Sequence, residues 1–157
     1  MKRYIIIVII GAVLAYALFG PGDNTSEIEA VFNKAIEAGE KKDFEGVMEH
    51  FSLTYRDEYG ATYPVVKKIV KNSFEKFDAL NCKYADLKVS INETEKGEKE
   101  AVANFNTYIS GISFGIPVSL LGGEDSLQNL TVTLKKSSFG EWKIIKVEGL
   151  EAAEGEF

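Results

Sequence analysis

The stretch LKVSINETEKGEKEAVANFNTYI, residues 87–109, alternates apolar and polar side chains on both sides of a charged segment. Side chains of a β-strand point alternately to opposite faces, so a repeat of two places the apolar ones on one face. The polar run NETEKGEKE between the two halves is typical of a turn. The stretch therefore predicts a β-hairpin whose inward side chains are Leu87, Val89, Ile91, Ala103, Phe105, Thr107 and Ile109.

Two further strands are predicted after this hairpin. Leu130, Val132 and Leu134 alternate with polar residues, and residues 142–147 form a last strand after the turn-like sequence SSFGE. Trp142 begins that strand, and we expect its indole to be largely buried against the helices.

The run SGISFGIPVSLLGG, residues 110–123, is too apolar for an ordinary surface loop. Gly115 and Pro117 interrupt it, so the run predicts a strand that is broken at these two positions. The alternative is a pocket rim or a docking patch, because exposed apolar surface often marks a contact site.

Three amphipathic helices are predicted before the strands. The sequence SEIE, residues 26–29, is a capping box that would start the first helix, which we expect to end near Gly39. Asp43 is expected to cap a second, shorter helix, and Thr62 with Pro64 opens a third. The positions that recur at helical spacing on the inner faces are Ile28, Val31, Phe32, Ala35 and Ile36, then Phe44, Val47, Met48 and Phe51, then Val66, Ile69, Val70, Ser73, Phe74 and Phe77.

An antiparallel sheet with one apolar face needs a covering layer, and the three helices can supply it. The predicted class is therefore α+β, with three N-terminal helices packed on a curved antiparallel sheet. The predicted domain spans residues 23–148, and residues 149–157 are predicted to be an acidic, flexible tail.

The N-terminal segment predicts a transmembrane helix before this domain. Residues 4–20, YIIIVIIGAVLAYALFG, carry no charge and follow a basic pair at residues 2–3. About 20 apolar residues span a bilayer, and the basic residues favour the cytoplasmic side. Residues 1–22 thus predict a single-pass anchor with the domain on the extracytoplasmic side. Ala15-Tyr16-Ala17 also fits a signal peptidase site, so secretion after cleavage is the alternative.

Charge and cysteine content limit the function classes. Two of the 18 basic residues precede Asp23, so residues 23–157 carry 24 acids against 16 bases. Such a surface repels phosphate backbones, and we expect no nucleic-acid partner. Cys82 is the single cysteine and His50 the single histidine, so the sequence predicts neither an internal disulfide nor a typical transition-metal site, and no cofactor.

Two stretches carry a resemblance to a known family. The helix pair VFNKAIEAGEKKDFEGVMEHFS, residues 31–52, and the last-strand sequence GEWKIIKVEG, residues 140–149, are similar to common patterns of the nuclear transport factor 2-like superfamily. The resemblance implies a cystatin-like cone, in which helices cover the mouth of a curved sheet. It also implies a choice among isomerases, dehydratases, hydrolases, ligand-binding modules and protein-assembly modules.

The predicted pocket lies inside this cone. The hairpin offers no titratable inward side chain, and general acid/base catalysis needs such a group within reach of the reacting atom. We therefore expect no catalytic residue and an apolar ligand pocket. Its expected lining is Tyr55, Tyr59, Phe74, Phe105, Thr107, Ile109 and Phe114.

The alternative is a pocket enzyme of the isomerase or hydrolase type that uses His50, Tyr55 and Asp57. On a helical wheel His50 lies about 100° from the apolar face of the second helix, because successive residues are about 100° apart. We therefore expect His50 to be exposed or at the boundary of the core. In the enzyme alternative it would pair with Asp57 or Glu58 as a base and its orienting group.

The sequence thus predicts a membrane-tethered, extracytoplasmic binding module. Its expected ligand is an apolar small molecule in the cone or another protein of the prokaryotic envelope on the sheet. A homodimer through the sheet is also compatible with this arrangement.

Overall fold

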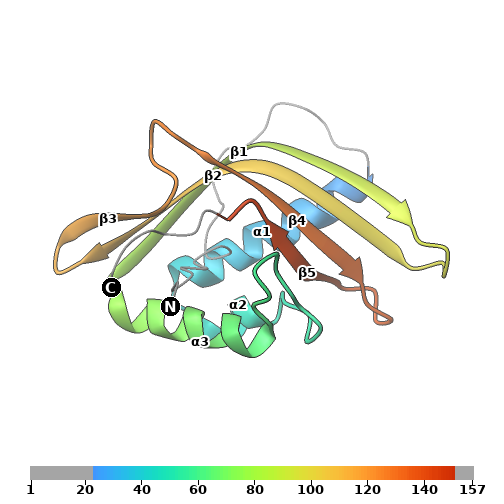
Figure 1. Cartoon of the computed structure of the whole chain (residues 1–157), viewed down its shortest axis with the longest axis horizontal. Coiled ribbons are helices and arrows are strands. Elements are labelled where there is room, and N and C mark those ends of the chain that lie inside the picture. The colour runs from blue at the N-terminus through green and yellow to red at the C-terminus, as the bar shows by residue number, and fades with distance from the viewer. Residues whose placement is uncertain (1–22, 151–157) are drawn as a thin grey trace.

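The computed structural model describes residues 23–150, which form two layers. Three helices lie on the concave side of a strongly curved antiparallel sheet (Figure 1). The helices are α1 (Asp23–Glu40), α2 (Phe44–Met48) and α3 (Tyr63–Lys76). The predicted α+β class, with three helices packed on a curved sheet, is confirmed.

The sheet has five strands and a branched order. These are β1 (Ala79–Glu93), β2 (Lys99–Ser113), β3 (Ile116–Leu121), β4 (Gln128–Lys136) and β5 (Trp142–Glu148). The hydrogen-bonded order is β1-β2-β4-β5, and β3 also pairs with β2. Strand β2 pairs with β4 over residues 100–107 and with β3 over residues 109–113. It is therefore the central strand of the sheet.

The predicted hairpin faces are confirmed. Val89 pairs with Ala103 and Ile91 with Ala101, so these side chains share the inner face. Strand β1 begins at Ala79, earlier than the alternation predicts, and a bulge lies between Ala85 and Lys88. Before the bulge the even-numbered residues are buried, and after it the odd-numbered ones face inward. The extra residue in the bulge causes this change and bends the strand.

The core fills the space between the sheet and the helices. Phe105 of β2 packs its ring edge-on against Phe32 of α1, with ring centroids 5.2 Å apart, and against Tyr84 of β1 at 6.0 Å. Such aromatic pairs contribute about 0.5–1.5 kcal/mol each beyond their buried area. Trp142 is buried, as predicted, and its indole N–H reaches α1.

The helix boundaries differ from the predictions in two places. Helix α1 begins at Asp23, so Ser26 lies inside the helix and the predicted capping-box start is wrong. Asp43 caps α2 as predicted, and its carboxylate accepts the Gly46 N–H at 3.1 Å. Helix α2 ends at Met48, and Phe51 instead forms a parallel bridge with Ile144 of β5.

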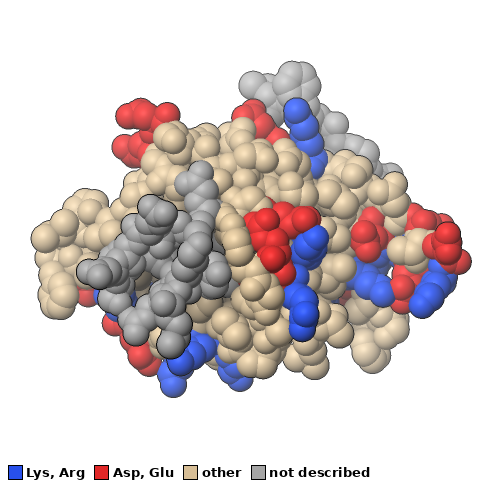
Figure 2. Space-filling view, viewed as in Figure 1, with Lys and Arg blue, Asp and Glu red and all other residues tan. Residues whose placement is uncertain are grey.

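The apolar run 110–123 forms a second hairpin. The chain turns at Phe114-Gly115, where both residues have positive φ angles of 52° and 76°, as a tight two-residue turn requires. Pro117 does not break the chain but lies in the edge strand β3, where a missing N–H is tolerated. Residues 110–121 contain no charged side chain, and on the face drawn in Figure 2 the end of the molecule formed by this hairpin is uncharged.

The predicted anchor, residues 1–22, lies outside the described residues. From residue 23 to residue 150, no helix is both long and apolar enough to cross a membrane.

Candidate functional site

Four of the seven predicted pocket residues are buried in the core between sheet and helices. They are Tyr55, Phe105, Thr107 and Ile109. Thr107 donates its hydroxyl proton to the carbonyl of Lys83 at 2.8 Å, and its oxygen lies 3.4 Å from the sulfur of Cys82. These four side chains therefore belong to the buried core between the sheet and the helices.

The other three predicted residues lie at the surface in separate places. The Tyr59 ring is 42% exposed, and its hydroxyl donates to the Leu150 carbonyl at 2.5 Å. Phe114 is 96% exposed at the tip of the β2–β3 hairpin. Phe74 is half-buried and faces a groove beside α3. The structure therefore brings only the four core residues together.

An open groove of about 630 Å³ lies between α2 and α3. We call it the α2–α3 groove, and its lining residues are Phe44, Pro64, Lys67, Lys68, Lys71, Phe74 and Glu75. Those from α3 recur at intervals of three or four positions, which places them along one face of the helix. Val66, Val70 and Ser73 are buried on the opposite, sheet-facing side. Helix α3 therefore buries one face in the core and lines the groove with another.

The groove combines an apolar floor with a positively charged rim. The Nζ of Lys67 lies 5.7 Å from the centre of the Phe44 ring, within cation–π distance. No ion pair among residues 23–150 involves Lys67, Lys68 or Lys71. Three cationic groups thus border Phe44, Pro64 and Phe74 on a chain that is otherwise acidic. The sequence already contained this stripe of lysines at helical spacing, which the pocket prediction did not use.

Tyr55 and Asp57 lie in the loop that joins α2 to α3. This loop is held along β5, because the N–H groups of Ser52 and Arg56 donate to the carbonyls of Ile144 and Ile145. Burial raises the pKa of the Tyr55 hydroxyl, and the carboxylates of Asp57 and Glu58 raise it further. Within residues 23–150 the hydroxyl has no hydrogen-bond partner. Tyr55 is therefore a core residue with a buried polar end.

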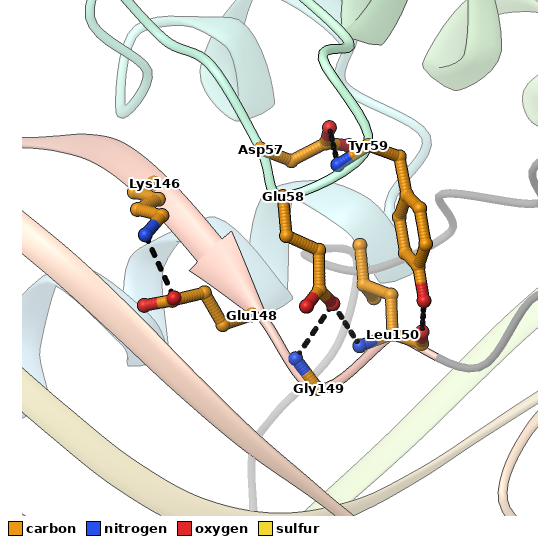
Figure 3. A network of polar contacts seen from close by, with 7 residues as sticks. All are labelled: Asp57, Glu58, Tyr59, Lys146, Glu148, Gly149 and Leu150. Atoms are coloured by element: carbon orange, nitrogen blue, oxygen red, sulfur yellow. Dashed lines mark hydrogen bonds and ion pairs between the residues drawn. The ribbon is translucent and has the colours of Figure 1, made fainter.

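One oxygen of Asp57 holds the turn at the end of this loop. Its Oδ1 accepts the N–H group of Tyr59 at 2.9 Å (Figure 3). The same oxygen accepts the N–H group of Ala61 at 2.7 Å. The other oxygen, Oδ2, is buried and has no partner among the residues described. The hydrogen bonds therefore assign Asp57 a structural role in the turn.

His50 is 7% exposed, so the expectation of an exposed or boundary histidine is wrong. Burial lowers the pKa of its imidazole, and this effect outweighs the nearby Glu49 carboxylate, which lies 3.7 Å from Nε2. In the described part of the chain, Glu49 is the one carboxylate at ion-pair distance from the ring. His50 thus does not pair with Asp57 or Glu58 as the enzyme alternative requires.

A polar network that the sequence did not indicate fixes the end of the described chain. Glu58 Oε1 accepts the N–H groups of Gly149 at 2.8 Å and Leu150 at 2.9 Å (Figure 3). Leu150 is buried, although both residues were assigned to the flexible tail. The contacts of Gly149 and Leu150 with Glu58 and Tyr59 place the last described residues beside the loop that leads into α3.

The described residues show no cluster of three or more histidine, cysteine, aspartate or glutamate side chains that could hold a metal ion. Cys82 is buried, and burial raises its pKa to about 12, which makes its thiol unreactive.

Comparisons with known proteins give the fold. No protein-family model matches the chain, and no curated protein matches it in sequence. A nuclear transport factor 2 (NTF2-like) superfamily protein from Salmonella enterica is 16% identical, with a TM-score of 0.62, over 86% of this chain and 100% of its own. An NTF2-like protein with a cystatin-like fold from Novosphingobium aromaticivorans is 13% identical, with a TM-score of 0.59, over 85% of this chain and 84% of its own.

A larger protein contains a similar unit. The helical cell shape determining protein Pgp2 from Campylobacter jejuni is 13% identical over 80% of this chain, with a TM-score of 0.63. The match spans only 40% of the Campylobacter chain, so the likeness concerns one part of that protein. The chain described here has the cystatin-like fold of nuclear transport factor 2-like proteins.

Proposed function

We propose that this chain is a membrane-tethered, extracytoplasmic binding domain that holds an apolar, negatively charged small molecule in the α2–α3 groove. The observation that carries the proposal is the joint presence of an aromatic floor and a lysine rim. Phe44, Pro64 and Phe74 supply the floor, and Lys67, Lys68 and Lys71 supply the rim.

The size and chemistry of the groove suit such a ligand. Small-molecule sites usually enclose about 300–1,000 Å³ and combine an apolar lining with a few polar groups. The groove volume of about 630 Å³ lies within that range. Burial of an alkyl or aromatic body yields about 25 cal/mol per Å², and the lysines attract a carboxylate. An acyl-chain carboxylate meets both requirements.

The lining favours binding over turnover. Its titratable groups are three lysines and Glu75, at an open surface. Tyr55, Asp57 and His50, which the enzyme alternative needs, are buried elsewhere and line no part of this groove. The enzyme alternative therefore gains no support from the residues of the groove.

Tethering rests on the sequence. The uncharged segment at residues 4–20 ends three residues before α1 begins at Asp23, so a membrane anchor would connect to the domain through a very short linker.

Calorimetric titration tests the binding proposal. A chain of residues 23–150 contains all the core residues described above, and dodecanoate is the probe, with 1-dodecanol as the neutral control of equal length. Dodecanoate should bind more tightly, and changing Lys67, Lys68 and Lys71 to Glu should weaken its binding about tenfold or more, which corresponds to about 1.4 kcal/mol. Phe74→Ser should weaken both probes. Equal affinity for both probes, or no binding of either, would contradict the proposal.

A further inference from the structure

The last described residue, Leu150, lies beside the loop that leads into α3, the helix that lines most of the α2–α3 groove. Leu150 is held by Glu58 and Tyr59, and Tyr59 lies four positions before Tyr63, the first residue of α3. The loop between them is compact, because Arg56 bridges to Thr62 and the Asp57 N–H donates to the Ala61 carbonyl at 3.0 Å. Hydrogen bonds therefore hold Leu150 to the loop that precedes the N-terminal end of α3.

The segment that follows has the composition that the groove would bind. Residues 151–157, EAAEGEF, carry three carboxylates, no basic side chain and one aromatic ring. The groove offers three lysines that form no ion pair within residues 23–150, and an apolar floor that includes two aromatic rings. Charge and apolar character are thus complementary between the two.

The segment is also long enough. Seven extended residues span at most about 23–25 Å, while the 14 residues of α3 rise about 21 Å along the helix axis. A chain that starts beside the loop before α3 can therefore run along most of the groove. Because the segment is tethered, its effective concentration at the groove reaches the millimolar range, so even a weak contact is populated.

We propose that residues 151–157 occupy the α2–α3 groove of the same chain, with Phe157 on the apolar floor and the carboxylates of Glu151, Glu154 and Glu156 beside the lysines. This inference rests on the groove that the proposed function uses. The segment then acts as an internal competitor, and an external anionic ligand must displace it before it can bind.

Disulfide trapping in the full-length chain tests this contact without any ligand. Gly155→Cys is combined with Lys68→Cys in the groove, or with Leu53→Cys as the matched control. Leu53 is 80% exposed in the loop that also carries Tyr59, so random collisions of the segment reach it as well. The native thiol of Cys82 is buried and does not compete. The groove pair should form an intrachain disulfide about tenfold faster than the control pair.

Charge variants provide the second readout. Changing Glu151, Glu154 and Glu156 to Lys should reduce the rate of the groove pair to that of the control. Changing Lys67 and Lys71 to Glu in the same chain should then restore it. The same charge change at Lys83 and Lys88, which are exposed on β1, should not restore it.

Three results would overturn the inference. They are equal rates of disulfide formation for the groove and control pairs, a groove-pair rate that the charge changes leave unaltered, and a disulfide that forms only between two chains. Failure of dodecanoate to bind the 23–150 chain would contradict the proposed function and leave the trapping result standing. Failure of trapping would leave the ligand titration standing.

Discussion

The indole N–H of Trp142 donates to the Oε2 of Glu27 at 2.7 Å, and the Nζ of Lys136 lies 2.9 Å from the same oxygen. One carboxylate of α1 thus joins the ends of β4 and β5, at residues more than 100 positions away in the sequence. Because Trp142 is buried and Glu27 is exposed, the pair connects the core to a surface ion pair.

Replacing Trp142 by Ala should strongly destabilise the domain. Loss of a buried Trp side chain typically costs about 3–5 kcal/mol, a large part of the 5–15 kcal/mol that usually stabilises a domain. Trp142→Phe keeps an aromatic ring but loses the hydrogen bond to Glu27, so it should cost less. Urea unfolding followed by circular dichroism measures both. An unchanged unfolding midpoint for Trp142→Ala would show that its packing contributes little.

Acid should weaken the link between Glu27 and Trp142. The hydrogen bonds from Lys136 and then from Trp142 lower the pKa of Glu27 below its ordinary value of 4.5. A lowered folded-state pKa stabilises the fold above the unfolded value, and this contribution is lost as the pH falls through the folded value. Glu27→Gln should therefore reduce the dependence of unfolding free energy on pH below 4.5. An unchanged dependence on pH in Glu27→Gln would contradict a contribution of this hydrogen-bonded carboxylate to stability.

The Tyr55 hydroxyl should contribute nothing to stability. It is buried without a partner among residues 23–150, so Tyr55→Phe removes a desolvated polar group and no described hydrogen bond. The variant should be as stable as the wild type, or more stable by up to about 1–2 kcal/mol. A clear loss of stability would show that the hydroxyl has a partner.

Asp57 should behave in the opposite way. Asp57→Ala removes the acceptor of two backbone N–H groups, those of Tyr59 and Ala61. Leaving these donors without a partner should cost about 1–3 kcal/mol. Ser and Thr can also accept such bonds, so Asp57→Ser should recover part of the loss. Equal unfolding free energies for the wild type and Asp57→Ala would contradict the structural role of this turn.

His50 should make the domain sensitive to mild acid. Burial lowers the pKa of its imidazole below the ordinary value of 6.5, so the unfolded state binds the proton first. Stability is then complete above pH 6.5 and declines as the pH falls through the lower folded-state value. Unfolding free energies at about pH 7.5 and about pH 5.5, well above the range of most carboxylates, measure the decline. His50→Gln should show a smaller one.

The orientation at the membrane can be tested independently. If the apolar segment at residues 4–20 anchors the chain and the basic pair before it stays inside, the domain from Asp23 onward faces outward. Protease added to spheroplasts should then digest the domain, while a cytoplasmic marker protein stays intact. Full protection of the domain, with digestion after lysis, would contradict this orientation.

The parts of the fold that local sequence determines were predictable. The alternation along β2 places Ala101, Ala103, Phe105, Thr107 and Ile109 inward, and it depends only on side-chain spacing. The Asp43 cap and the burial of Trp142 could likewise be predicted from the residue type and its immediate neighbours in the sequence. These features fixed the class and the order of the elements.

The parts that depend on packing between distant segments were not predictable. The helical wheel for His50 assumed that α2 continues to Phe51, but the chain leaves the helix after Met48 to pair with β5. Asp86, in the bulge of β1, has a positive φ of 59°. No local sequence pattern predicted this bulge. The α2–α3 groove arises from the spacing of two helices, so its lysines had no evident target in the sequence.

The pairing of the loop before α3 with β5 imposes an order on synthesis. His50, Ser52 and Arg56 form their backbone hydrogen bonds with Ile144 and Ile145, about 90 residues later in the chain. Ribosomes add about 5–20 residues per second, so this loop waits roughly 5–20 s for its partner to be made. A chain released before Trp142 has no strand to receive the loop. The loop can therefore take its place only after β5 has been synthesised, and until then these backbone groups lack their partners.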